Sequence, residues 1–201
     1  MSHERPTLIA LAGPNGAGKS TAGPRLLRET LGVTVFVNAD VIAQGLAAFE
    51  PERVAVAAGR LMLARLRELG RQRKTFAFET TLAGRAYARW LYDLLRKGYE
   101  FDLVFLYLPS PEFAIERVRS RVHTGGHAIP ESTIRRRYHA GLRNFFALYR
   151  PLTTTWRTFD NSKSVPLRLL AAGRGVEVEE VHDEATWRRL ETTYGSQRRG
   201  G

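Results

Sequence analysis

Cysteine is absent from the 201-residue sequence, and only four of its 31 basic residues are lysine. Without cysteine there is no disulfide, zinc–thiolate site or cysteine nucleophile. No apolar run is near the ~18 residues that a membrane-spanning helix requires, and the N-terminus lacks the apolar segment of a signal peptide. These absences predict a cytoplasmic protein with no membrane partner.

Acidic residues are few relative to basic ones, 20 against 31, which gives a net charge of +11. A field of this sign attracts nucleotides, phosphorylated small molecules and nucleic acid alike. The preference for arginine over lysine also has a simple explanation, because a genome rich in G and C favours arginine codons. Charge therefore indicates an anionic partner without identifying it.

The composition is otherwise that of a folded protein, with 43% hydrophobic and 25% charged residues. A chain of this length suits a single domain, which we expect over residues 1–194. Residues 195–201, GSQRRGG, have no apolar side chain to bury and are predicted to form a disordered tail.

Short apolar runs alternate with longer helical patterns, which predicts strands joined by crossover helices around a mostly parallel sheet. The most hydrophobic run, residues 101–108, should form the central strand. Other strands are predicted at residues 7–12, 33–38 and 74–79, with further ones at 154–161, 166–172 and 175–181. Helices are predicted at residues 19–31, 51–70 and 85–97, from 111 to the glycines at 125–126, from about 130 onward, and at 184–194.

Residues 13–20, GPNGAGKS, match the phosphate-loop pattern G-x-x-x-x-G-K-[ST] at every fixed position. The pattern lies between a predicted strand and a predicted helix, where backbone N–H groups and the helix N-terminus bind phosphate. Lys19 would reach the terminal phosphates, and the Ser20 hydroxyl would bind Mg²⁺. The residues predicted to hold the nucleotide are Gly13, Pro14, Asn15, Gly16, Ala17, Gly18, Lys19, Ser20 and Thr21.

The sequence also disfavours several classes of NTPase that use such a loop. It has no LSGGQ-type signature, and its most hydrophobic strand is followed by Pro109 and Ser110 rather than Asp-Glu, so an ABC transporter ATPase is disfavoured. An NKxD-type guanine motif is absent as well. Phosphoryl transfer to a second substrate remains, on an α/β P-loop NTPase-type three-layer sandwich with a helical lid.

Polar residues follow two of the predicted strands, at the edge where ligands meet a parallel sheet. Asp40 is the candidate base for an acceptor hydroxyl, or alternatively the N-cap of a helix beginning at residue 41. Glu79 could bind substrate hydroxyls, pair with an arginine or order Mg²⁺ through water. Asn38, Thr80 and Thr81 are further candidates for substrate contact, and the two threonines could instead cap the loop.

Arginines are concentrated in residues 117–145, which we predict to form the lid. Arg117 and Arg121 are four residues apart and share a helix face. In the next helix, Arg136 is predicted on a polar stripe with His139 and Arg143. Guanidinium groups stabilise the charge that develops on a transferred phosphoryl group, although each arginine could also simply face solvent.

Gly125 and Gly126 are expected to act as the hinge between the two helices of this lid. His127 follows directly, and it would either contact phosphate or play a structural part. No second ligand lies at a spacing suitable for zinc.

These motifs together resemble the zeta-toxin-like P-loop kinases, in particular their free-standing bacterial branch. The resemblance covers about residues 8–162 and is carried by GPNGAGKST, NADVIA, FAFETTLAG, FLYLPSPE, ERVRSRVHTGGHAIPESTIRRRY and FDNS. It implies ATP-dependent phosphorylation of a small-molecule hydroxyl, with UDP-N-acetylglucosamine as the substrate of the toxin branch. The motif match implies that Lys19 and Ser20 bind ATP and Mg²⁺, that Asp40 is the base, and that Glu79 and Thr80 face the sugar nucleotide.

The same resemblance implies that lid arginines act on the γ-phosphate, and it leaves open whether Arg121, Arg136 or Arg137 does so. Arg117, Arg137 and His127 are assigned to substrate contact. Thr154 departs from the branch, in which an Asp is expected at that position. These motifs do not indicate whether the protein is toxic or binds an antitoxin.

Three functions are therefore compared. A kinase of a small-molecule hydroxyl is favoured, and a kinase of a nucleoside, nucleotide or antibiotic keeps the same fold with another acceptor. A nucleic-acid-binding ATPase is disfavoured because the arginines gather in the lid and are not interleaved with aromatic stacking platforms.

Overall fold

The structure, a computed structural model, describes residues 5–25, 27–28, 32–123, 128–163 and 167–195. Within these ranges one sheet contains seven strands, namely β1 (Thr7–Ala12), β2 (Phe36–Val37), β3 (Phe76–Thr80), β4 (Glu100–Tyr107), β5 (Thr155–Asp160), β6 (Arg168–Arg174) and β7 (Glu177–Val181). Their order across the sheet is β2-β3-β1-β4-β5-β6-β7. The first five strands in that order are parallel, and β6 and β7 are antiparallel to their neighbours.

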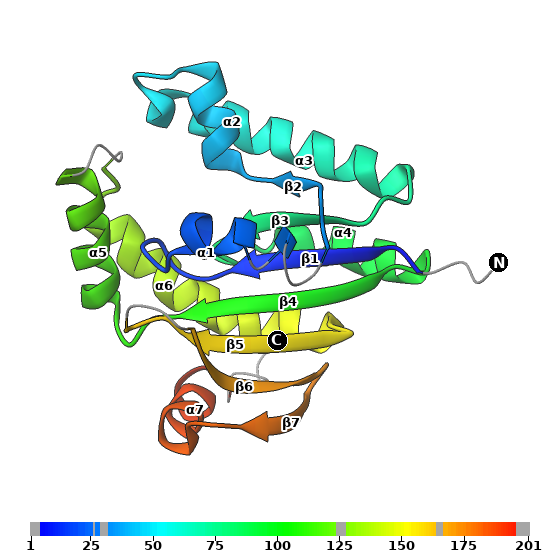
Figure 1. Cartoon of the computed structure of the whole chain (residues 1–201), viewed down its shortest axis with the longest axis vertical. Coiled ribbons are helices and arrows are strands. Elements are labelled where there is room, and N and C mark those ends of the chain that lie inside the picture. Colours follow the sequence, from blue (N-terminus) through cyan, green and yellow to red (C-terminus); the bar gives the residue numbers. More distant parts are fainter. Residues whose placement is uncertain (1–4, 26, 29–31, 124–127, 164–166, 196–201) are drawn as a thin grey trace.

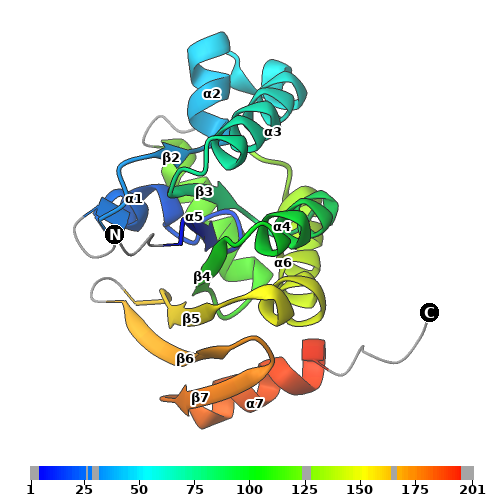
Figure 2. The ribbon, with the colours of Figure 1, turned by 90° about the vertical axis from the view of Figure 1, so that its right-hand side faces the viewer.

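Helices cover both faces of this sheet (Figure 1). The helices are α1 (Lys19–Arg25), α2 (Ala39–Leu46), α3 (Ala55–Arg71), α4 (Ala86–Arg96), α5 (Pro111–His123), α6 (Glu131–Asn144) and α7 (Glu184–Leu190). Figure 2 shows α1 on one side of the sheet and α4 and α6 on the other, so the predicted layered α/β architecture is confirmed. Along the parts of the chain that the structure describes, no helix combines the length and apolar character needed to cross a bilayer.

β4 is the central strand, as its hydrophobicity predicts. It lies between β1 and β5, and its side chains from Leu103 to Tyr107 are buried because both faces of the sheet are covered. The core continues to the far side of the sheet, where the rings of Trp156 on β5 and Trp187 on α7 stack at 5.2 Å between centroids. This stacking packs α7 against β5.

One predicted strand is too long. The strand expected at 33–38 pairs only over Phe36–Val37, because it lies at the sheet edge and the Val33 N–H instead bonds the Leu27 carbonyl at 2.9 Å. The helix expected at 19–31 is α-helical over Lys19–Arg25, and residues 27–28 are π-helical. Residues 26 and 29–31 lie outside the described residues, as do residues 196–201 of the predicted tail.

The position of α6 depends on a close approach of this helix to the loop after β3. A Cβ built on Gly141 would lie 2.4 Å from the Thr81 carbonyl oxygen, which belongs to the backbone and cannot swing away. We expect Gly141→Ala to lower the free energy of unfolding by about 1–3 kcal/mol through overpacking, measured by urea denaturation.

The matched control is Gly59→Ala in α3, where an added Cβ meets nothing within 4 Å. This control should gain up to about 1 kcal/mol, because alanine is the better helix former. Equal stabilities for the two variants would show that α6 is free to shift on the loop.

Candidate active site

The phosphate loop, residues 13–21, joins the end of β1 to the start of α1. Gly13, Gly16 and Gly18 have φ angles of 144°, 77° and 77°, which L side chains rarely adopt. A Cβ on Gly13 would lie 2.4 Å from the Leu106 carbonyl oxygen, and one on Gly16 would lie 2.7 Å from that of Ala114. The glycines therefore let the loop turn tightly against β4 and α5, as a phosphate cradle requires.

Lys19 is buried, with 6% of its surface exposed. Its ammonium donates to the carbonyl oxygens of Gly13 and Pro14, both at 2.9 Å, and lies 3.7 Å from Glu79 Oε1. Burial lowers the pKa of Lys19, and the nearby carboxylates of Glu79 and Asp40 oppose that shift. The loop thus holds a desolvated cation, which interacts with phosphate more strongly than an exposed one would.

Glu79 connects the loop to the neighbouring strand. It ends the apolar part of β3 beside β1, where its Oε2 accepts hydrogen bonds from Ser20 Oγ at 3.2 Å and Asn38 Nδ2 at 2.7 Å. Burial raises the pKa of this carboxyl, while Lys19 lowers it. The sequence left pairing with an arginine open as one role of Glu79, and in the structure its ion-pair partner is Lys19. Contact with substrate hydroxyls stays a prediction.

Asp40 is not the helix cap. The cap of α2 is Asn38, whose Oδ1 accepts from the backbone N–H of Asp40 at 2.7 Å, so the helix begins two residues earlier than predicted. Both ends of the buried Asn38 amide are therefore bonded to protein groups, Asp40 and Glu79. The Asp40 side chain is left on the first turn of α2, exposed toward the site.

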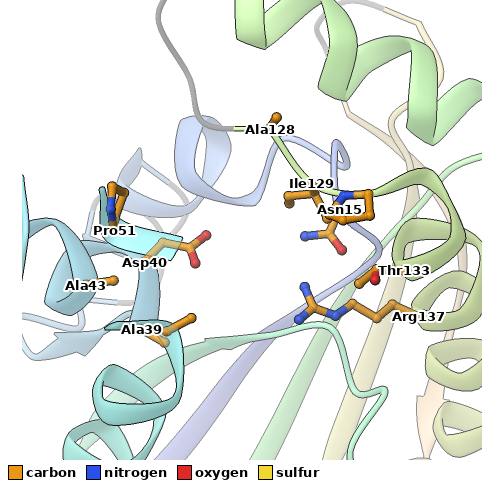
Figure 3. Close-up of a pocket in the computed structure, with 11 residues that line it drawn as sticks. Asn15, Ala39, Asp40, Ala43, Pro51, Ala128, Ile129, Thr133 and Arg137 are labelled. Atoms are coloured by element: carbon orange, nitrogen blue, oxygen red, sulfur yellow. The ribbon is translucent and has the colours of Figure 1, made fainter. Parts of the chain in front are cut away.

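Two cavities of about 280 Å³ each meet at this point. The first, which we call the phosphate cavity, is lined by the loop together with Asp40, Glu79, Arg117 and Arg121. The second, which we call the α2–α6 cavity, lies between those two helices, and Asp40 and Arg137 point into it from opposite walls (Figure 3). Asn15 and Asp40 line both cavities, so molecules bound in the two cavities would contact the same two side chains.

The predicted arginines separate into different positions. Arg117 and Arg121 both line the phosphate cavity from α5, which agrees with their shared helix face. The Arg117 guanidinium lies 5.0 Å from the Phe113 ring centroid and donates to the Ser162 carbonyl at 3.3 Å. Arg137 lines the α2–α6 cavity, whereas Arg136 is exposed and lines neither.

The predicted polar stripe on α6 agrees with the burial pattern, since Ile134 and Tyr138 are buried while Arg136 and Arg143 are exposed. His139 on this stripe is partly buried, and its Nδ1 makes a 2.8 Å hydrogen bond with the hydroxyl of Tyr194.

The threonines after β3 act within their own loop. Thr80 Oγ1 accepts from the Leu82 N–H at 3.0 Å and Thr81 Oγ1 from the Ala83 N–H at 3.4 Å, and neither residue lines the two cavities. Their predicted substrate contact stays a prediction. His127 lies outside the described residues.

Asn161, which the sequence analysis placed in the FDNS motif without assigning it a role, positions the phosphate loop. Its Nδ2 donates to the Ala17 carbonyl at 2.8 Å, and a Cβ on Gly18 would lie 2.8 Å from that nitrogen. A signal was available, because Asn161 follows a strand whose carboxyl end meets the same sheet edge as the loop.

The oxygen donors at the loop fit a magnesium ion bound with a nucleotide. Mg²⁺ in such sites keeps waters and phosphate oxygens and takes only one or two protein ligands. Among the described residues, no group of three or more His, Asp or Glu could hold a metal by itself. The Ser20 hydroxyl, next to the Glu79 carboxylate, is the group of this chain that would bind the ion.

The charge of Glu79 should set the pH range of nucleotide binding. In Glu79→Gln the carboxylate that supports the Lys19 cation is gone, so burial lowers the pKa of Lys19 further. Since protonated Lys19 is the form that attracts phosphate, the affinity of the variant should fall off at lower pH than that of the parent. We expect the ratio of the two Kd values for a fluorescent ATP analogue to grow by about tenfold between pH 6 and pH 9, one unit of pKa being a factor of ten.

The control for this titration is Glu68→Gln, which removes an exposed carboxylate that bonds Arg65 and Gln72. Its Kd should follow that of the parent at every pH. A constant ratio for Glu79→Gln would show that the carboxylate does not support the Lys19 charge.

Comparison with known proteins agrees with this loop and sheet. A family model described as an AAA domain matches residues 8–141, more than half of the chain. A Haemophilus influenzae protein of uncharacterised function is 28% identical over 130 residues, which are 65% of this chain and 91% of that protein.

Two solved structures are similar in fold. The AvrRxo1-ORF1:-ORF2 complex with ATP has a TM-score of 0.73 at 19% identity, over 99% of this chain and 67% of that one. A structure of the PezAT chromosomal toxin–antitoxin system of Streptococcus pneumoniae has a TM-score of 0.64 at 17% identity, over 98% of this chain and 81% of that one. At these identities the likeness shows the fold, and it confirms the predicted P-loop NTPase-like class.

Proposed function

The chain belongs to this AAA domain family, whose members carry a P-loop kinase-like domain, and on that premise we propose that it is an ATP-dependent phosphotransferase with a small-molecule hydroxyl as acceptor. One observation carries the proposal. The Asp40 carboxylate lies where the phosphate cavity meets the α2–α6 cavity, so a base stands between a nucleotide site and room for a second molecule. A protein that only hydrolyses or senses a nucleotide has no need of that second cavity.

The chemistry assigns a task to each group. The acceptor oxygen attacks the γ-phosphorus, forming an O–P bond, while the bond from that phosphorus to the β–γ bridging oxygen breaks and ADP leaves with the electron pair. Asp40 takes the hydroxyl proton. Lys19 and Arg121 face the transferred charge from the loop and from α5. Mg²⁺ held at Ser20 would neutralise phosphate charge, which is the chemistry that the ion supplies.

The acceptor and the setting belong to the proposal as well. The resemblance to zeta-toxin-like kinases favours a sugar nucleotide such as UDP-N-acetylglucosamine, near Glu79 and Thr80, and a nucleoside, nucleotide or antibiotic is the alternative. A cytoplasmic location would supply ATP. PezAT is a toxin–antitoxin system, but no described residue of this chain indicates an antitoxin.

Incubation with Mg-ATP and a pool of metabolites tests the proposal. Mass spectrometry should find a product with a single added phosphate that forms only with active protein. Hydrolysis of ATP with no phosphorylated product would contradict the proposal. Tight binding of nucleic acid that weakens steeply with ionic strength would favour the nucleic-acid-binding alternative instead.

A further inference from the structure

The α2–α6 cavity contains a guanidinium that has no ion-pair partner among the described residues. Arg137 is half-buried and faces the Asp40 carboxylate across the cavity, but within the described ranges it forms no hydrogen bond or ion pair. Burial and the neighbouring Arg136 lower the pKa of Arg137, and Asp40 raises it. Burying a cation without a partner is costly, so a counter-charge from outside the chain is expected here.

Neighbouring arginines do not share this condition. Arg135 pairs with Glu112, and Arg119 pairs with Glu131, although all four side chains are largely exposed. Glu112 on α5 and Glu131 on α6 are thus paired with exposed arginines, which water alone could solvate. Neither of these carboxylates pairs with Arg137, the arginine that faces the cavity.

A second polar group in the same cavity also lacks a partner. Asn15 Oδ1 is buried and accepts no hydrogen bond from the described part of the chain. Leaving such an atom unsatisfied typically costs ~1–3 kcal/mol. Figure 3 shows the Asn15 amide next to the Arg137 guanidinium, with the Asp40 carboxylate across the cavity from both.

Apart from the Thr133 hydroxyl, the rest of the cavity wall is small and apolar, and it includes Ala39, Ala43, Pro51, Ala55 and Ile129. Among the described residues that line the cavity, Asp40 and Arg137 are the only charged ones. The volume of about 280 Å³ is just under the ~300–1,000 Å³ that is typical of pockets for drug-sized ligands. A compact molecule with one charged end therefore fits this cavity better than a nucleoside diphosphate sugar does.

We propose that the acceptor is a compact hydroxy compound carrying one oxyanion group, a carboxylate or a phosphate monoester, which Arg137 binds while the reacting hydroxyl lies at Asp40. A guanidinium suits this ligand because it binds two oxygens of one oxyanion at once. The inference rests on the proposed kinase function, and it replaces the sugar nucleotide that the resemblance favours with a smaller acceptor. It makes Arg137 a specificity-determining residue, while Arg117 and Arg121 serve the nucleotide phosphates.

A panel of acceptors in matched neutral and anionic forms tests this. Glycerol is compared with D-glycerate and glycerol 3-phosphate, and N-acetylglucosamine with its 6-phosphate and with UDP-N-acetylglucosamine, each with Mg-ATP. We expect an anionic compact member to have a kcat/KM at least ten times that of its neutral form. Arg137→Gln should raise KM for that acceptor by on the order of 30-fold or more. The KM for ATP should stay unchanged.

Two further variants separate charge from structure. Arg137→Lys keeps the charge without the two-pronged geometry and should recover part of the lost acceptor affinity. Arg96→Gln, at an exposed position in the last turn of α4 that lines neither cavity, should leave both KM values as they are. A merely structural role for Arg137 would instead lower stability and kcat without a selective change in acceptor KM.

Several outcomes would overturn the inference. Equal use of neutral and anionic members, a rise in KM for ATP in Arg137→Gln, or activity with UDP-N-acetylglucosamine alone would each do so while leaving a kinase. If the panel gives no product but the metabolite pool does, the inference fails and the proposed function stands. If neither gives a product, both fail.

Discussion

Replacing Asp40 with asparagine should lower kcat for phosphoryl transfer by about 10²–10⁴-fold, the usual contribution of a general base. Asparagine has nearly the same shape as aspartate but cannot accept the hydroxyl proton. The helix should survive, because Asn38 caps α2 and the bond that it accepts comes from the backbone of residue 40. Single-turnover measurement of the phosphorylated product, with the acceptor found in the metabolite pool, gives the rate.

ATP binding in the same variant should stay within about twofold of the parent, since Lys19 and the loop glycines are unchanged. Asp93→Asn is the control, because this carboxylate lies exposed on α4 and lines neither cavity. An Asp40→Asn protein with normal turnover would remove the base from the proposed mechanism. Loss of ATP binding along with turnover would point to a role in binding the nucleotide instead.

Local sequence patterns were sufficient for the phosphate loop and the order of strands and helices. The loop is a contiguous motif between two elements, so its place at the end of β1 follows from residues 7–21 alone. The position of Asp40 could be predicted too, because parallel strands place their carboxyl ends at one edge. The structure confirms that Asp40 and Lys19 line the same cavity.

The orientation of α6 and the roles of two asparagines depend on contacts between residues far apart in the chain, which local sequence patterns do not reveal. The rotation of α6 is set by Gly141 against the Thr81 carbonyl and by His139 bonding Tyr194, contacts that span 60 and 55 residues of chain. A helical-stripe argument for Arg136 could not include them. The same holds for Asn38, whose amide reaches Glu79 on another strand, and for Asn161, which reaches the loop from 144 residues away.

Two of the three arginines considered for transition-state contact, Arg121 and Arg136, give a matched pair for the lid. Arg121→Ala should lower kcat by about 10³-fold, because removal of a guanidinium near the transferred phosphoryl group typically has an effect of that order. Arg121 lines the phosphate cavity, and its charge acts on the buried Lys19, lowering the pKa of that amine. Arg136→Ala removes the same charge from an exposed site outside both cavities and should change kcat by less than about twofold.

The comparison is decided by kcat and by the KM for ATP, measured on both variants under one set of conditions. Because the two substitutions change net charge equally, any general effect of the basic field on phosphate affinity cancels between them. Free guanidinium added to Arg121→Ala should restore part of the rate if the missing group acts at the phosphoryl centre, and should not help Arg136→Ala. A larger loss in Arg136→Ala would mean that α6 turns during the reaction and brings its exposed face to the nucleotide, and Arg121 would then lose its assigned role.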